Sequence, residues 1–189
     1  GLAQRALTMK SLGDAIHLRN RLIQNLEEAD FECFPEQREP LLTFVVAGGG
    51  FAGVETIAGV NDFIREAVEF YPHLREENIR MVLVHPGAVI LPELGEKLGA
   101  YAHKKLAERK VEIRVNTRVI GVTEDGVALS DGSVIKTNTL VWTAGTSPNP
   151  LLQKLPCAKD RGRRKVGSTM GVPGCPGVSA FGECASVPY

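Results

Sequence analysis

The chain has 189 residues, of which 43% are hydrophobic, and its 22 basic and 22 acidic side chains cancel to a formal net charge of zero. This composition supports one or two globular domains, and a neutral chain has no overall field that would recruit nucleic acid. No apolar stretch is long enough to cross a bilayer as a helix. Neither an initiator Met nor a signal-peptide core opens the sequence, which indicates a piece of a longer protein.

The cysteines are few and widely spaced. None forms a C-x-x-C pair, and none lies between residues 41 and 150. The pattern matches neither a zinc site nor a disulfide framework, so a reduced, cytoplasmic compartment is expected. The four positions are Cys33, Cys157, Cys175 and Cys184.

The first predicted element is an amphipathic helix over residues 11–29, with Ser11 or Asp14 as its N-cap. Its apolar positions recur at helical spacing, and Arg19 is the one polar residue on that face. Residues 30–40 contain two prolines and little periodicity, so a connector is expected there. The predicted apolar face consists of Leu12, Ala15, Ile16, Leu22, Ile23 and Leu26.

A glycine-rich turn follows a seven-residue apolar run, residues 41–47, and opens a long helix over residues 54–70. Glycines 48, 50 and 53 complete a G-x-G-x-x-G pattern in the strand–turn–helix context that it requires. Gly48 permits the sharp turn, Gly50 lets a pyrophosphate approach the main chain, and Gly53 lets the helix pack close to the strand. Free N–H groups at the helix start would bind the phosphates. The pattern predicts a dinucleotide site; the alternative is a glycine-rich turn without a ligand.

The elements that follow predict an α/β fold. Strand, helix and strand alternate with short joints, which requires right-handed crossovers and a parallel, Rossmann-like sheet. Three short strands separated by Gly-containing turns then form an antiparallel three-stranded meander before a last buried strand. The predicted strands cover residues 80–84, 111–115, 118–122, 127–129, 134–136 and 139–143. The predicted helix covers residues 96–109, and its expected buried residues are Leu98, Tyr101, Ala102, Leu106 and Ala107.

The C-terminal part is rich in proline and glycine from residue 146 to residue 176. It carries a basic run, for which a solvated loop is the simplest interpretation and a phosphate or membrane contact is the alternative. A short strand is predicted at residues 178–181, just before Gly182 and Glu183. The basic run consists of Lys159, Arg161, Arg163, Arg164 and Lys165.

Five stretches of the chain together resemble one family. They are the glycine turn with its Val54-Glu55, the strand R-M-V-L-V, V-I-L-P at 89–92, T-L-V-W-T-A-G-T-S-P-N-P at 139–150 and V-S-A-F-G-E-C-A at 178–185. The chain resembles the two-dinucleotide-domain flavoproteins of the pyridine nucleotide-disulfide oxidoreductase superfamily, and within it the type II NADH dehydrogenases. Such enzymes pass electrons from NADH through FAD to a quinone.

The resemblance covers the middle of the family's chain and implies three parts. Residues 1–40 resemble the end of the first FAD-domain part, residues 41–145 the NAD(H)-binding domain, and residues 146–189 a returning part of the FAD domain. The implied cofactors are NAD(H) and, in the full-length protein, FAD. The family meets the membrane through a C-terminal domain that this sequence lacks, so the expected location is cytoplasmic, with the full-length protein peripheral on the cytoplasmic membrane face.

The resemblance also implies site residues. Glu55 would lie near the nicotinamide and the flavin and is the candidate catalytic residue; an acidic side chain stabilised by the helix dipole is the simpler alternative. His85 stands where the family has an acidic residue that binds the adenosine ribose, so NADH is expected, with weak discrimination against NADPH. Gly182-Glu183 replaces a G-D pair whose Asp contacts the flavin. The full cofactor-binding set is Gly48, Gly49, Gly50, Phe51, Ala52, Gly53, Glu55, His85, Ala144, Gly145, Gly182 and Glu183.

Two other functions remain open at this point. One is the NAD(P)H-binding domain of another flavoprotein disulfide reductase, and the other is a non-catalytic nucleotide-binding module. Because one glycine fingerprint holds one dinucleotide, the isolated chain is expected to bind NAD(H) but not FAD, and to lack NADH:quinone activity. Leu22, Ile23 and Leu26 would be exposed without a partner domain and would favour a homodimer.

Overall fold

The computed structural model describes residues 6–145 and 149–187, which form two compact units that divide between Ala144 and Gly145. Each unit has its own sheet and its own apolar core. Among the described residues, no helix is long and apolar enough to span a membrane. Within the same ranges, no group of three or more His, Cys, Asp or Glu side chains is arranged to hold a metal ion.

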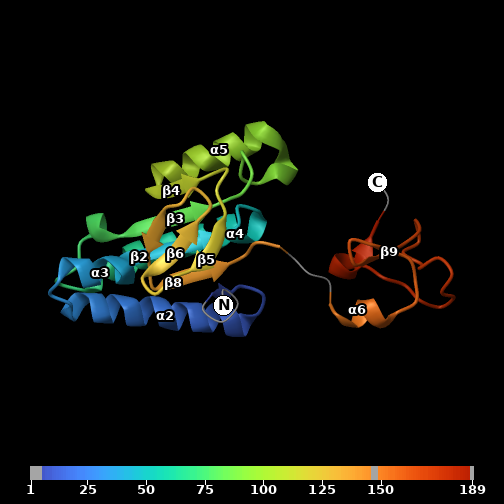
Figure 1. The fold of residues 1–189 in the computed structure, drawn as a ribbon, viewed down its shortest axis with the longest axis horizontal. Helices are drawn as coiled ribbons and strands as arrows, with labels where there is room; N and C mark the ends of the chain where they lie inside the picture. Colours follow the sequence, from blue (N-terminus) through green and yellow to red (C-terminus); the bar gives the residue numbers. More distant parts are fainter. Residues whose placement is uncertain (1–5, 146–148, 188–189) are drawn as a thin grey trace. The chain divides into compact units, whose positions relative to one another are not determined.

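The first unit is built on a five-stranded sheet with the order β1-β8-β2-β3-β4, in which every neighbouring pair is parallel (Figure 1). All five residues of the central strand β2 (Thr43–Ala47) are buried, as expected for a parallel strand covered on both faces. The predicted Rossmann-like sheet is confirmed, and β1 extends it by one short edge strand. The other strands are β1 (Leu7–Thr8), β3 (Arg80–Val84), β4 (Val111–Arg114) and β8 (Thr139–Trp142).

Alternate residues of the central strands enter two different cores. Phe44 and Val46 of β2 pack against the helices, whereas Val45 and Ala47 pack against the antiparallel meander. In Figure 1 the meander is seen in front of the parallel sheet and α4 (Phe51–Ala67) behind it. The sheet is therefore covered on both faces, as its continuous apolar strands require. The meander strands are β5 (Val119–Val122), β6 (Gly126–Leu129) and β7 (Val134–Lys136), which confirms the predicted three-stranded meander.

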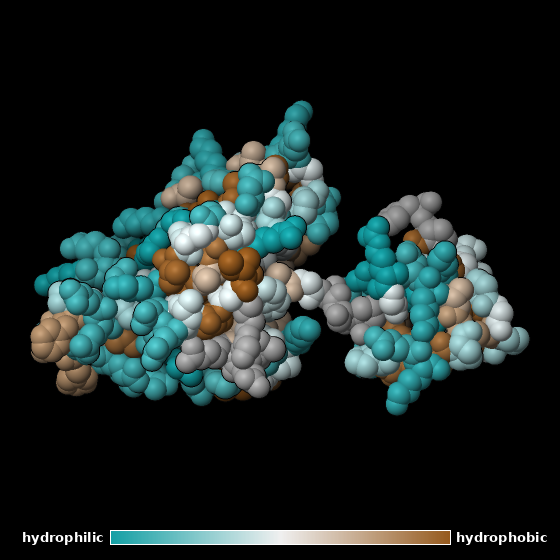
Figure 2. Space-filling view, viewed as in Figure 1, coloured by the Kyte–Doolittle hydropathy of each residue, from teal (hydrophilic) through white to brown (hydrophobic). Residues whose placement is uncertain are grey.

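The outer face of the meander carries apolar side chains. Figure 2 shows a mainly hydrophilic surface on the visible side of this unit, with apolar side chains gathered over the meander. Ile120 is 62% exposed and Val134 is 52% exposed, while Ile135 points inward and is buried. An antiparallel sheet with one buried and one exposed face has this alternation.

Helix α2 (Leu12–Phe31) buries only part of its predicted apolar face. Leu22 and Leu26 are buried in the core with Leu18 and Ala29, whereas Leu12, at the start of the predicted face, is 78% exposed. The expectation that Leu22 and Leu26 lie exposed is therefore wrong, and with it goes the basis for a homodimer through these residues. Ile16, also on the predicted face, is 45% exposed, so the buried side of α2 is shifted toward Leu18 and Ala29.

The start of α2 follows the predicted capping. The Ser11 hydroxyl accepts a hydrogen bond from the Asp14 N–H at 3.2 Å, and the Asp14 carboxylate accepts one from the Ser11 N–H at 3.0 Å. These two bonds form a capping box, which satisfies main-chain donors that the first turn leaves free.

The expected connector at residues 30–40 contains most of a second helix, α3 (Pro35–Leu42). Pro35 is compatible with a first helical turn, where its missing N–H costs nothing. Leu41 and Leu42 end this helix, so the strand β2 begins at Thr43 and not at Leu41. The two prolines concealed the helix from sequence reasoning because proline usually marks a break.

Helix α5 (Gly95–Glu108) also differs from its prediction in the face it buries. Leu106 is buried, but Leu98 and Tyr101 are 53% and 60% exposed, although they were expected inside together with Ala107, which is exposed too. A side chain at Gly99 would overlap Val89 and the Ile90 carbonyl oxygen. The helix thus approaches the loop before it through a glycine, and this close contact turns the large side chains outward.

The second unit has a small sheet with the order β11-β10-β9. The basic run, interpreted as a solvated loop, instead supplies β9 (Lys159–Asp160) and β10 (Arg163–Lys165), and Arg164 is only 1% exposed. The strand predicted at residues 178–181 is limited to a single bridge between Ser179 and Gly171. The third strand is β11 (Ala185–Ser186), and one short helix, α6 (Leu151–Lys154), precedes the sheet.

A disulfide joins Cys157 and Cys175 in this unit, which contradicts the expectation that the cysteines form none. Cys33 and Cys184 are free. The bonded pair packs against a core of four buried side chains, and the segment between the two cysteines is largely irregular. Sequence spacing gave no signal for the pair because irregular chain imposes no periodic relation between its ends. The four core residues are Val166, Val172, Ala180 and Ala185.

Candidate dinucleotide-binding site

The glycine turn lies at the carboxyl end of β2, between the ends of β3 and β8. From β2 the chain passes through α4 to β3 on one side, while β8 pairs with β2 on the other side. The strand order thus reverses at β2, with β3 and β4 on one side and the later strand β8 on the other. In open parallel sheets, ligands bind in the crevice outside the carboxyl ends of the strands at such a point. This edge of the sheet is the candidate site.

Gly48 and Gly53 are required by the close packing of the turn. Gly48 has φ +119°, a conformation open to glycine, and its N–H donates to the Val84 carbonyl at 2.8 Å. A Cβ on Gly48 would lie 2.8 Å from the Ala144 nitrogen, and a Cβ on Gly53 would overlap the Gly48 carbonyl oxygen. The turn and the first turn of α4 therefore touch main chain to main chain, as the roles expected of these two glycines demand.

Gly50 is different, because a Cβ at this position would meet no protein atom within 4 Å. Gly50 is the N-cap of α4, and Phe51 and Ala52 after it are exposed. The N–H groups of the first turn of a helix have no acceptor within the helix, so they point outward at this open position with the positive end of the helix dipole. The space in front of Gly50 fits the pyrophosphate of a dinucleotide.

Thr143 is a structural member of the site that the sequence analysis missed. Its hydroxyl oxygen lies 2.9 Å from the Ala47 carbonyl oxygen and 3.2 Å from that of Gly48. The Thr143 N–H also donates to the Ala47 carbonyl at 2.9 Å. These contacts fasten the end of β8 to the glycine turn. The available signal was a hydroxyl residue directly before Ala144-Gly145 at the end of an apolar strand.

His85 follows β3 and is half-buried against the glycine turn. The Gly49 N–H donates to His85 Nδ1 at 3.1 Å, and the Gly49 carbonyl accepts from the Leu91 N–H at 2.7 Å. Burial lowers the pKa of His85, while a main-chain hydrogen bond with Val89 and the charge of Glu93 oppose that effect. The ring is therefore neutral at pH 7, and Nδ1 is the acceptor nitrogen, because a main-chain N–H can only donate.

Glu55, the candidate catalytic residue, is exposed on α4 two residues after Gly53. It opens onto a groove of about 350 Å³ between α2 and α4, which is lined also by Ala52, Arg19 and Phe63. Within residues 6–145 and 149–187, no ion pair ties Glu55 to another side chain. A free carboxylate beside the helix start can meet a ligand group without first breaking an internal bond.

Ala144 ends the first unit beside the glycine turn, and Gly145 is the first residue of the second unit. The Ala144 carbonyl accepts a hydrogen bond from Trp142 Nε1 at 2.7 Å, and Gly145 has φ +78°. The Ala144 main chain is the nearest neighbour of Gly48 in the turn. These positions agree with an edge where main chain, and not side chains, would face a ligand.

Gly182 and Glu183 belong to the second unit, whereas the glycine turn belongs to the first. Gly182 has φ +64°, and the Glu183 carboxylate pairs with Arg163 Nη2 at 2.9 Å. They border a hollow of about 360 Å³ with Asp160 and Ser186. The described residues contain no second turn in which a strand passes through a glycine fingerprint into a long helix.

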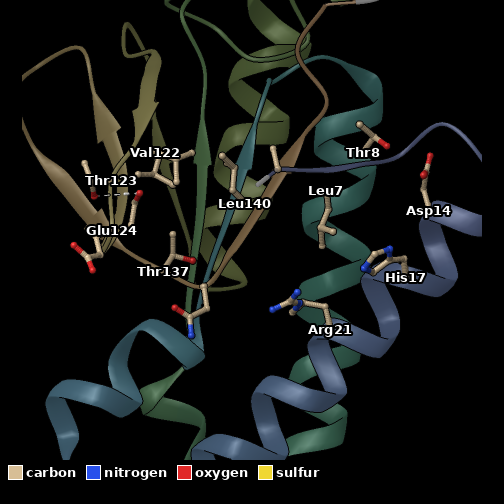
Figure 3. Close-up of a pocket in the computed structure, with 14 residues that line it drawn as sticks. Leu7, Thr8, Asp14, His17, Arg21, Val122, Thr123, Glu124, Thr137 and Leu140 are labelled. Atoms are coloured by element: carbon tan, nitrogen blue, oxygen red, sulfur yellow. Dashed lines mark hydrogen bonds between the residues drawn. The ribbon is translucent and has the colours of Figure 1, made fainter. Parts of the chain in front are cut away.

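A larger cavity, of about 540 Å³, lies away from the glycine turn (Figure 3). It is enclosed by β1, the first half of α2, the meander and the start of β8, and its polar side chains include His17, Arg21 and Glu124. Figure 3 shows Arg21 and His17 projecting from α2 toward it. None of the predicted site residues lines this cavity.

Comparison with known proteins gives a consistent result. Residues 4–189 match the family described as Pyridine nucleotide-disulphide oxidoreductase. The chain is 34% identical over 195 residues to the type II NADH:quinone oxidoreductase Ndh of Mycobacterium tuberculosis, with 98% of this chain and 42% of that protein covered. It is 32% identical to the mitochondrial external alternative NADH-ubiquinone oxidoreductase of Yarrowia lipolytica, covering all of this chain and 35% of that protein. The chain thus spans about two fifths of the length of these relatives.

A solved structure shares the fold. NDH2 from Plasmodium falciparum, determined in complex with NADH, superposes with a TM-score of 0.88 at 22% identity, covering 99% of this chain and 41% of that chain. At this level of identity the likeness speaks for the fold alone. The expected α/β class is confirmed by it and by the strand order described above.

Proposed function

Because the chain belongs to the pyridine nucleotide-disulphide oxidoreductase family, we propose that it binds NAD(H) at the glycine turn. The full-length protein would pass a hydride from NADH to FAD and on to a quinone-type acceptor. The observation that carries this proposal is the open N-terminus of α4 at Gly50, set between two glycines that the packing requires. A turn without a ligand would need the flanking glycines but would tolerate any side chain at Gly50.

The chain's own residues would act by binding and orientation. The N–H groups from Gly50 onward hold the pyrophosphate, and the tight contact of Gly48 with Ala144 fixes the edge on which the nicotinamide half lies. Glu55 would stand beside the reacting rings, where its charge steers the nicotinamide. FAD, when bound, accepts the hydride and passes the electrons on. No acid–base pair is required of the protein for such a transfer.

The described residues of this chain could contact only one edge of a bound FAD. Gly182 and Glu183 would contact the flavin from the second unit, in which Gly182 has a conformation suited to a close approach. The described residues offer no second glycine turn for the flavin's pyrophosphate. We therefore expect the isolated chain to be colourless and to lack NADH:quinone activity, and we propose that residues of the full-length protein outside this chain complete the flavin site.

The division of the chain into three parts and the cellular location of the full-length protein are proposals. We propose that residues 41–145 form the NAD(H)-binding domain and that residues 1–40 and 146–189 continue into the FAD domain of the full-length protein. That protein would work at the cytoplasmic membrane face and meet the membrane through a segment outside this chain, where a quinone is accessible. Sedimentation of the purified chain would decide whether it forms a homodimer.

Calorimetric titration of the chain with NADH tests the site. Gly50→Val places a branched side chain where the pyrophosphate would lie, and no protein atom opposes that side chain. We expect a folded variant without detectable NADH binding. Gly59→Val is the matched control, since a Cβ at Gly59 on the same helix also meets no atom within 4 Å. It should bind as the unmodified chain does. Unchanged affinity in folded Gly50→Val would refute the proposed site.

A further inference from the structure

The imidazole of His85 occupies a fitted slot between two glycines. A Cβ at Gly49 would lie 2.8 Å from His85 Cγ, and a Cβ at Gly87 would lie 2.8 Å from His85 Nε2. The ring can lie this close to the main chain at both positions only because Gly49 and Gly87 have no side chain. Its Nδ1 accepts the Gly49 N–H at 3.1 Å. His85 therefore holds the middle residue of the glycine turn from outside.

This contact leaves the neutral ring with no acceptor for a ribose. A carboxylate at this position could accept two hydroxyl hydrogens from the adenosine ribose. A neutral imidazole has one acceptor nitrogen, and in this structure that nitrogen is used by Gly49. Its other nitrogen carries the proton and can only donate. A ribose hydroxyl therefore finds no free acceptor on His85.

We propose that His85 is a positioning residue for the phosphate-binding turn, and that protonation of His85 shifts the preference of this turn from NADH toward NADPH. The proposal rests on the proposed function. An imidazolium has an N–H on both nitrogens, so its Nδ1–H would face the Gly49 N–H, donor against donor. The protonated ring must release Gly49. It then presents a positive charge at the end of β3, where the 2′-phosphate of NADPH would bind.

The charges around His85 do not cancel this effect. Glu93, in the 3-10 turn Pro92–Leu94, is the carboxylate whose charge acts on the ring. On the neighbouring strand β4, Arg114 contributes its carbonyl oxygen to the His85 N–H at 2.8 Å, and its guanidinium is paired with Glu112 at 2.6 Å. The loop from Pro86 to Leu91 has no ionisable side chain. On α4 the nearest ionisable residue along the chain is Glu55.

The direction of the pH effect follows from linkage. Burial lowers the pKa of His85, so at pH 8 the ring is neutral and holds the turn. As the pH falls through the lowered pKa, the ring gains a proton and the hydrogen bond to Gly49 is lost. NADH, which needs the ordered turn, should bind up to about tenfold more weakly at one pH unit below that lowered pKa, because only the neutral ring holds the turn. NADPH should lose less, because the imidazolium attracts its phosphate.

Two variants separate this role from a merely structural one. In His85→Asn the side-chain oxygen stands at the position of Nδ1 and can accept from Gly49, but it does not titrate. We expect NADH binding near that of the unmodified chain at pH 8, and no loss at pH 5.5 beyond what the buffer change causes. His85→Leu has no acceptor and should bind NADH weakly at both values. Circular dichroism at both values confirms that the variants remain folded.

The decisive readout is the pKa of His85, measured by NMR of the imidazole with and without nucleotide. Binding is reciprocal, so NADH should lower the pKa of His85, and NADPH, which loses less affinity on protonation, should lower it less. The 2′-phosphate titrates near pH 6 by itself, and the same titration in His85→Asn measures that contribution. A pKa that NADH leaves unchanged, or equal pH dependence in the unmodified chain and His85→Asn, would overturn the proposal. Absence of NADH binding at pH 8 would instead refute the proposed function.

Discussion

The two units are stabilised by different means. The first buries whole side chains between three layers, and Ile57, Ile64 and Leu83 have no exposed surface. The second has a core of four small or medium side chains, and a disulfide crosses it. Small units bury a lower fraction of their surface and need such cross-links more often. The comparison teaches that the candidate nucleotide site sits on the part of the chain that packing alone can hold rigid.

Truncation of a core side chain should give the largest difference in lost stability between the two units. Ile57→Ala removes three carbons from the contact of α4 with the sheet and should lower the free energy of unfolding by about 2–5 kcal/mol. Val172→Ala in the second unit removes two carbons and should cost about 1–2 kcal/mol. Urea unfolding, followed by probes in each unit, measures both. Equal losses would mean that the two cores are equally well packed.

Removal of the disulfide should act on the second unit alone. The cysteines are 18 residues apart, and a loop of about 15 residues contributes about 3 kcal/mol through the unfolded state. Replacing Cys157 and Cys175 together by Ser should make residues 149–187 sensitive to protease while NADH binding persists. Cys33→Ser is the control, because Cys33 is free and exposed. If the NADH affinity fell with the disulfide, the second unit would be supporting the site.

A buried polar contact joins α2 to the sheet of the first unit. Asn25 Nδ2 donates to Thr139 Oγ1 at 2.8 Å, and each residue is 1% exposed. Asn25→Leu leaves the Thr139 hydroxyl without this donor and should cost about 1–3 kcal/mol. Thr139→Val should cost a similar amount, and the double variant should cost less than the sum of the two. Additive losses in chemical denaturation would show that the two side chains are not coupled.

The smallest expected effect is on the surface of the first unit. Glu76 pairs with Arg65 at 2.7 Å and with Lys110 at 2.9 Å, and the Lys110 hydrogen bond is the main cause of its lowered pKa. The stabilisation is present above the ordinary carboxyl pKa, and it is lost as the pH falls through the lowered value. Glu76→Gln should therefore shift the melting temperature slightly at pH 7 and low salt. The shift should vanish in 1 M salt, where such pairs are screened; a shift that persisted there would have to come from packing.

Sequence reasoning predicted the parts of the fold that periodicity controls. The strands β3 and β7 agree with their predicted residues, because alternating or continuous apolar runs between turn signals leave little choice. The buried faces of α2 and α5 were partly wrong. Both helices carry apolar residues on more than one side, and contact with the sheet decides which of them is covered.

Some residues of the candidate site could likewise be predicted from the sequence, and others could not. The glycines at 48, 50 and 53 were predictable, because the motif needs a positive φ at the first, open space at the second and close packing at the third. Thr143 and the acceptor role of His85 were not predictable. Both depend on which strand lies beside β2, and Thr143 is 95 residues from the Gly48 that it contacts. The Cys157–Cys175 pair was missed for a different reason, because largely irregular chain joins the two cysteines and gives no periodic signal.

The central claim is that NAD(H) binds at the glycine turn, and main-chain amide shifts on titration with NADH test it most directly. The account predicts the largest ¹H–¹⁵N shifts at Gly50, Phe51 and Ala52, where free N–H groups would meet the phosphates. The amides of residues 149–187 should move least. Largest shifts at Arg21 and Thr123, around the cavity in Figure 3, with the Gly50 amide unmoved, would contradict the account.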